Sequence, residues 1–306
     1  MSTSIPFKRV YNLLLSEETR KKSEKWILGI AISGFIIHLL SILIIELGWW
    51  DISNHSGLLD NPIAAIYTPF TFILVYEVYL LVFYLPQSIT TYVSKQYEII
   101  TLIIIRRLFK DLAGIKLSSD WFEIKKDLQF TYDIVASVVL FFLLYLFYRL
   151  SKNRPKKNTA EGKLPDEIER FIQFKKVLAS ILVPILFGLA IYSFVSWSIS
   201  LLPGRVDAPI EFLNINKIFF GEFFTLLIIV DVILLLWSFY YTDQFHKVIR
   251  NSGFIISTIL IRMSFSVEGL MNTILIVSAI LFGLVILKIH NLYEKNIFPT
   301  EMNTSR

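Results

Sequence analysis

Two carboxylates stand inside strongly apolar segments of this chain. Glu77 lies in the run Phe72–Phe83, Asp231 lies in the run Leu226–Trp237, and a valine follows each carboxylate directly. A charged side chain at the bilayer centre costs about 2.5–3.5 kcal/mol on insertion scales. Such a side chain therefore faces a partner of opposite charge, faces a water-filled cavity, or carries a proton. The two positions therefore predict either a pathway for an ion or polar solute, or salt bridges that hold helices together.

An arginine follows each carboxylate further along the chain. Arg106 comes 29 residues after Glu77, and Arg262 comes 31 residues after Asp231. At a rise of ~1.5 Å per residue, we expect Glu77 and Arg106 to lie about 10–15 Å apart along the membrane normal. Direct pairing would then need helix tilt or the full reach of the arginine side chain. The further pathway candidates are ionisable residues in the same apolar helices: Arg107, Lys95, Glu98 and His38.

His38 stands alone within the first apolar segment. A single histidine in an apolar helix is compatible with a proton relay, and equally with a hydrogen-bonded packing residue. The sequence leaves both interpretations open.

The two carboxylate–arginine sets indicate an internal repeat. In both copies the arginine ends a run rich in β-branched residues, and a basic residue (Lys95 or Arg250) stands about a dozen positions before it. We predict two four-helix repeats of the same orientation, related by an axis along the membrane normal. Parallel repeats of this kind occur in transporters, whose binding sites lie at the repeat interface. A duplicated structural bundle would leave the same pattern.

Long uncharged segments predict the helices that must position these residues. Val177–Gly204 runs for 28 residues without a formal charge and Gly269–Leu287 for 19, and a spanning helix needs ~20. Backbone groups in lipid must pair internally, which favours helices over strands. We expect an all-α, polytopic transmembrane bundle with eight spans, at residues 26–48, 63–86, 89–109, 131–150, 177–202, 218–241, 245–265 and 269–290.

Charge placement predicts the topology. Basic residues gather before the first span and in the loop 150–176, and such loops stay in the cytoplasm. An even number of crossings must then separate them, which favours full spans at 89–109 and 245–265. Because both segments are short and flanked by charge, a re-entrant course is the alternative. We expect a prokaryotic-type inner membrane with both termini cytoplasmic.

The chain is expected to divide into a first repeat at 1–150, a basic linker with an amphipathic helix at 151–176, and a second repeat at 177–306. The segments 6–22 and 164–176 mix apolar and basic residues, and predict either surface helices or extensions of the following spans. The expected partners are the bilayer, anionic lipid at the basic segments and other membrane subunits, but no nucleic acid.

Motifs for catalysis and cofactor binding are absent from the sequence. There is no cysteine, which excludes disulfides and thiolate metal sites. Metalloprotease, nucleophile-elbow, phosphate-loop and dinucleotide motifs are also missing, so we expect no enzyme, no cofactor and no metal site. The expected function is a channel or transporter-like protein for a small ion or polar solute. The alternative is a non-transporting structural or regulatory subunit of a membrane complex.

Overall fold

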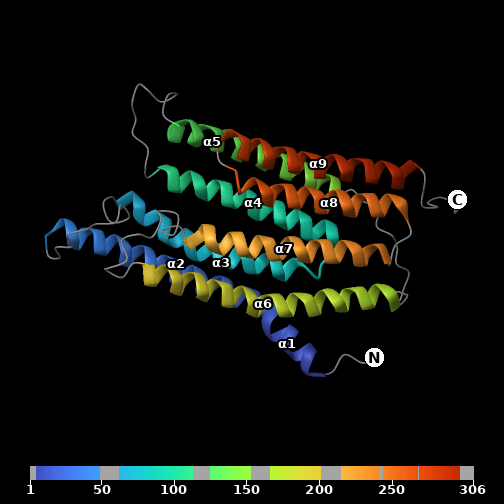
Figure 1. The fold of residues 1–306 in the computed structure, drawn as a ribbon, viewed down its shortest axis with the longest axis horizontal. Helices are drawn as coiled ribbons and strands as arrows, with labels where there is room; N and C mark the ends of the chain where they lie inside the picture. The colour runs from blue at the N-terminus through green and yellow to red at the C-terminus, as the bar shows by residue number, and fades with distance from the viewer. Residues whose placement is uncertain are drawn as a thin grey trace, which may run out of the picture. The chain divides into compact units, whose positions relative to one another are not determined.

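The computed structural model describes residues 5–48, 62–112, 125–152, 166–200, 215–240, 244–267 and 269–296. Within these ranges the chain is helical, with no strand, which confirms the all-α prediction. Figure 1 follows the elements in chain order: α1 Ile5–Leu15, α2 Glu17–Glu46, the 3-10 helix η1 Pro62–Ile66, α3 Tyr67–Tyr84, α4 Ile89–Leu112, α5 Lys125–Lys152, α6 Asp166–Ser200, α7 Ile215–Tyr240, α8 Phe245–Ser264 and α9 Leu270–Asn296.

Five stretches of helix in the described residues are long and apolar enough to cross a membrane. They are Arg9–Glu46, Leu128–Lys152, Ile168–Tyr192, Glu222–Tyr240 and Leu270–Asn296. A further apolar helix, Thr68–Tyr84, is shorter. These helices are those of a multi-pass membrane protein. Each of the eight predicted spans coincides with a helix, but α4 and α8 carry more charge and are not among the five, so eight crossings stay a prediction.

The two amphipathic segments behave differently. In the first, Ser16 caps α2 by accepting a hydrogen bond from the backbone N–H of Thr19 at 3.1 Å, and α1 ends before it. A serine at this position satisfies an N–H group that has no partner inside the helix. In the second, α6 continues without a break from Asp166 to Ser200. A separate helix therefore precedes only the first span, whereas the second segment extends its span.

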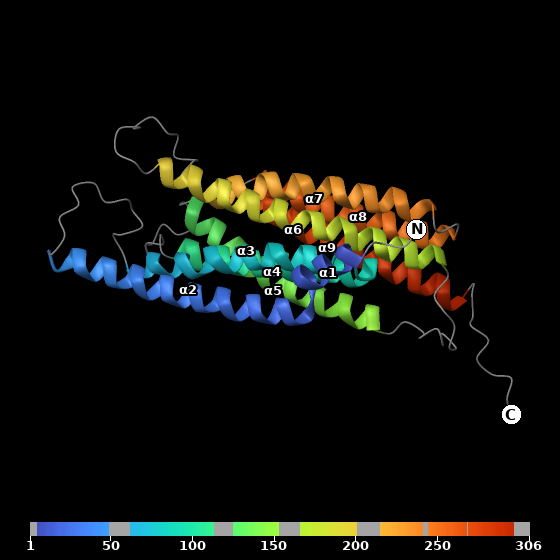
Figure 2. The same ribbon diagram turned by 90° about the horizontal axis from the view of Figure 1, so that it is seen from below.

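The described chain separates into two compact units. Unit 1 comprises Met1–Phe83, Leu102–Ile134 and Lys176–Phe223, and unit 2 comprises Tyr84–Thr101, Val135–Lys175 and Phe224–Arg306. Each unit thus draws on both halves of the sequence, and the predicted division at residues 150 and 177 stays a prediction. Within unit 1, α2 and α3 lie side by side (Figure 2) and share the hydrogen bond between His38 and Thr68. Within unit 2, α8 and α9 lie side by side (Figure 1).

Small residues allow the helices of unit 2 to pack closely. A Cβ added to Gly253 of α8 would stand 2.8 Å from the side chain of Ile286 of α9. One added to Gly283 of α9 would collide with the hydroxyl group of Tyr97. Glycine at such contacts is typical of helices packed in membranes, where close backbone approach replaces hydrophobic driving force. This packing brings the N-terminal part of α4 into the interior of unit 2.

Candidate functional site

Glu77 and Arg106 form an ion pair within unit 1. Only 9% of the arginine side chain and 6% of the glutamate side chain are exposed. Arg106 also donates to the carbonyl oxygen of Phe70 at 3.2 Å. The sequence left direct pairing dependent on helix tilt or on the reach of the arginine side chain, and the two side chains do pair. The long arginine side chain covers the offset, because two separate unpaired charges in an apolar interior would cost far more.

Asp231 and Arg262 form the corresponding ion pair in unit 2. Their charged atoms lie 2.8 Å apart, and 0% of the aspartate and 3% of the arginine side chain are exposed. The similarity that the sequence shows between the two sets therefore extends to their pairing. The arrangement of the chain as two four-helix repeats stays a prediction.

Asp231 is the centre of a larger polar group. Its carboxylate accepts hydrogen bonds from the hydroxyl of Tyr92 at 2.9 Å and from that of Thr258 at 3.4 Å. Arg262 uses the same nitrogen, Nη2, to donate to Asp231 and to Oε1 of Gln96, the latter at 3.1 Å. Each of these five side chains is at most 5% exposed. We call Tyr92, Gln96, Asp231, Thr258 and Arg262 the buried polar cluster.

Two donors of the buried polar cluster lack an acceptor. Among the described residues, neither Nε2 of Gln96 nor Nη1 of Arg262 has a hydrogen-bond partner. Arg262 and Gln96 are hydrogen-bonded to each other through Nη2 of the guanidinium and Oε1 of the amide. The two atoms without a partner belong to the same guanidinium and the same amide, so both lie beside that hydrogen bond. Buried donors without an acceptor cost about 1–3 kcal/mol, and their presence at one place points to a bound acceptor.

Lys175 adds a second positive charge to this region. Its side chain is 4% exposed, its ammonium group donates to the carbonyl oxygen of Gln87 at 2.9 Å, and it interacts electrostatically with Asp231. The sequence analysis did not single out Lys175, because it belongs to the basic segment before the fifth predicted span. Two cations, Lys175 and Arg262, thus accompany one carboxylate.

Arg107 has a partner that the sequence analysis missed. It forms an ion pair with Asp133 of α5, which is fully buried, while 26% of the Arg107 side chain is exposed. The amide of Gln129 donates to the same carboxylate at 2.9 Å. The available signal was a carboxylate two residues inside the predicted span 131–150.

The remaining candidates make local contacts. Lys95 pairs with Glu98 at 2.6 Å, one turn later on α4, and the hydroxyl of Tyr148 donates to Glu98 at 2.7 Å. Both charged side chains are partly exposed. Nδ1 of His38 lies 2.5 Å from the hydroxyl of Thr68. This contact between α2 and α3 favours the packing interpretation of His38.

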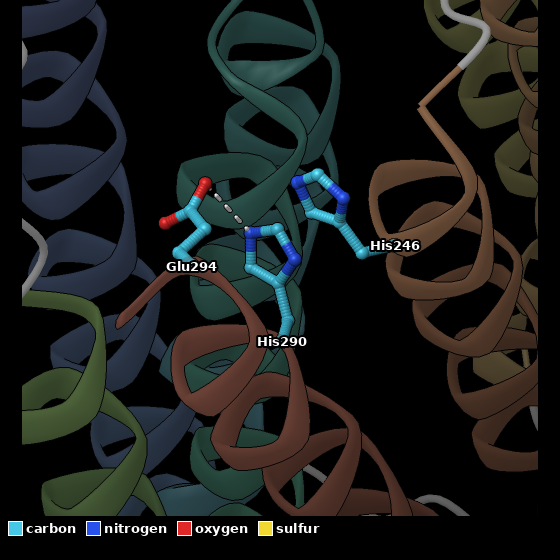
Figure 3. Close-up of side chains that lie close together, drawn as sticks. All are labelled: His246, His290 and Glu294. Atoms are coloured by element: carbon cyan, nitrogen blue, oxygen red, sulfur yellow. Dashed lines mark ion pairs between the residues drawn. The ribbon is translucent and has the colours of Figure 1, made fainter. Parts of the chain in front are cut away.

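A further group of ionisable residues lies where α8 begins and α9 ends (Figure 3). His246 stacks on His290 with ring centroids 5.2 Å apart, and Glu294 lies 3.3 Å from Nε2 of His290. Histidine and glutamate are ligands for transition metals. However, Nη1 of Arg250 lies 2.9 Å from the same Nε2. A guanidinium only donates, so this nitrogen accepts from Arg250 and is not available to a cation in this arrangement.

Comparison with protein-family models, curated proteins and solved structures found no match to this chain. The inference of function therefore starts from the buried charges described above.

Proposed function

We propose that this multi-pass membrane protein conducts or transports a small ion or polar solute through the region of its buried charges. Polar groups buried among apolar helices are costly, and in membrane proteins they mark ion and substrate pathways. The observation that carries the proposal is the pair of donors without acceptors on Gln96 and Arg262. These two donors belong to side chains that are hydrogen-bonded to each other, so one passing acceptor would meet both.

We further propose that the protein lies in a prokaryotic-type inner membrane with both termini in the cytoplasm, and that it is not an enzyme. In this arrangement α4 and α8 cross fully, and the ion pairs of Arg106 and Arg262 lower the cost of placing these arginines in the bilayer. The basic segments at the cytoplasmic face would contact anionic lipid headgroups.

A second candidate function is a structural or regulatory subunit of a membrane complex. The observation that favours it is the ion pairing of Glu77 with Arg106 and of Asp133 with Arg107. Paired charges of this kind define which helices pack together without moving any solute. The two candidates make opposite predictions for solute flux.

The test is ion flux through proteoliposomes that contain the purified protein. Protons, Na⁺, K⁺ and Cl⁻ are offered separately under a concentration gradient. Wild type is compared with Glu77→Gln and Asp231→Asn, which remove a buried negative charge at nearly constant volume. Glu18→Gln serves as the matched control, because Glu18 is 78% exposed and pairs only with Lys22 at the start of α2.

We expect at least one ion to cross in wild type and in Glu18→Gln, and the flux to fall at least tenfold in one or both buried variants. Size-exclusion profiles and helical circular dichroism verify that each variant is folded, and if one buried variant is not folded the other decides. No flux of any ion in wild type would reject transport in favour of the subunit role.

A further inference from the structure

We infer that the buried polar cluster of unit 2 binds a monovalent inorganic anion of about the size of chloride. Binding itself is independent of transport. That this anion is also the transported species rests on the proposed function.

The hydrogen-bonding groups left open in the cluster are donors. Nη1 of Arg262 and Nε2 of Gln96 have no acceptor among the described residues, while the carboxylate of Asp231 already accepts from Tyr92, Thr258 and Arg262. A guanidinium N–H and an amide N–H can only donate. The two groups without a partner therefore cannot bind a cation, whereas an anion would satisfy both donors.

The charges of the region also favour an anion. Arg262 and Lys175 are two buried cations, and Asp231 is the single carboxylate with which both interact. The side chains are at most 5% exposed, so water screens the remaining positive charge poorly. One monovalent anion would balance it. A water molecule would satisfy the donors but leave the net positive charge of the region unbalanced. A divalent anion would make the net charge of the region negative.

Burial limits the size of the ligand. Gln96 is 4% exposed and Arg262 is 5% exposed, so a ligand that meets both donors is enclosed by the protein. A monatomic halide needs only a few N–H contacts and little space. This argues for chloride rather than for a carboxylate or phosphate compound.

The test is the thermal unfolding of the purified full-length protein in detergent, with sodium gluconate replaced stepwise by sodium chloride at constant ionic strength. A ligand that binds only the folded state raises the midpoint in a saturable manner, here by roughly 4 °C at a hundredfold excess over its Kd. The variants are Gln96→Leu, which removes one free donor, and Arg262→Lys, which keeps the charge but loses the planar donor group.

The matched control is Gln129→Leu. It removes a partly buried amide from unit 1, where the amide donates to Asp133. We expect wild type and this control to show the saturable rise, and Gln96→Leu and Arg262→Lys to lose at least half of it. If one of the two cluster variants fails to fold, the other still decides.

Two results would overturn the inference: a wild-type midpoint that is the same in chloride and gluconate, or a chloride response that Gln96→Leu leaves intact. Flux in proteoliposomes is scored separately. Flux without a chloride-dependent midpoint refutes the anion site and keeps the proposed function. A chloride-dependent midpoint without flux supports the anion site and refutes the proposed function.

Discussion

The hydroxyl of Tyr97 lies 2.6 Å from the hydroxyl of Ser257, and Gly283 of α9 leaves the space in which the two meet. Ser257 also donates to the carbonyl oxygen of Ala279 at 2.6 Å, so this hydrogen-bond chain joins α4, α8 and α9. A methyl group at position 283 would enter the place of the tyrosine oxygen. The contact therefore predicts which glycine substitutions the protein tolerates.

Gly283→Ala should destabilise the protein by about 1–3 kcal/mol, the usual cost of forcing extra volume into a packed interior. The added Tyr97→Phe change should restore most of that loss, because it removes the colliding oxygen. Chemical unfolding in detergent measures both effects. Gly188→Ala is the control, since no atom lies within 4 Å of a Cβ added there. Equal stability of the two alanine variants would contradict the packing described for unit 2.

The Glu77–Arg106 pair predicts strong coupling between its two members. Glu77→Gln should cost about 3–5 kcal/mol, because it leaves the Arg106 charge buried without its counter-ion. The double variant Glu77→Gln with Arg106→Met should be more stable than Glu77→Gln alone, since no buried charge is then left. A double-mutant cycle of unfolding free energies measures the coupling. Additive single effects would show that the two side chains are not paired.

Asp133→Asn should have a smaller effect than Glu77→Gln. It weakens the contacts with Arg107 and Gln129, and we expect a loss of about 1.5–3 kcal/mol. The reason for the difference is exposure, since 26% of the Arg107 side chain is exposed and can regain polar contacts. The same unfolding assay ranks the two variants, and a larger loss for Asp133→Asn would contradict this explanation.

Thr68→Val tests the role of His38. The substitution keeps the side-chain shape but removes the hydroxyl that contacts Nδ1, so unit 1 should lose about 0.5–1.5 kcal/mol. If His38 only packs, ion flux in proteoliposomes should not change in the folded variant. Ser41→Ala is the control, because that hydroxyl donates to the carbonyl oxygen of Ile37 on its own helix. Lost flux with unchanged stability would restore the proton-relay interpretation.

Sequence patterns predicted the helices well because an apolar run of about 20 residues is easily recognised and favours a helix. All eight predicted spans coincide with helices. The carboxylates and arginines that pair were also recognised from their spacing. The direct contact of Glu77 with Arg106 was left open, because helix rise alone gives the depth of a backbone position and says little about the reach of a flexible side chain.

Tertiary partners on distant segments were out of reach for the same reason. Asp231 is bonded to Tyr92 across 139 residues of sequence, and Arg262 to Gln96 across 166. Tyrosine and glutamine carry no charge and do not interrupt an apolar pattern strongly, so nothing in the sequence marked them. The stacked pair of His246 and His290 was hidden likewise, because each histidine alone looks like an ordinary residue at a helix end.

The pairing of Glu77 with Arg106 has a consequence for biogenesis. As lone residues at the bilayer centre, the two would each cost about 2.5–3.5 kcal/mol during insertion, and α4 alone is too polar to count as a span. Only residues 85–88 separate α3 from α4, so the opposite charges can meet while both helices are still beside the translocon. The two helices would then enter the lipid together as a hairpin, with the salt bridge formed during synthesis rather than after it.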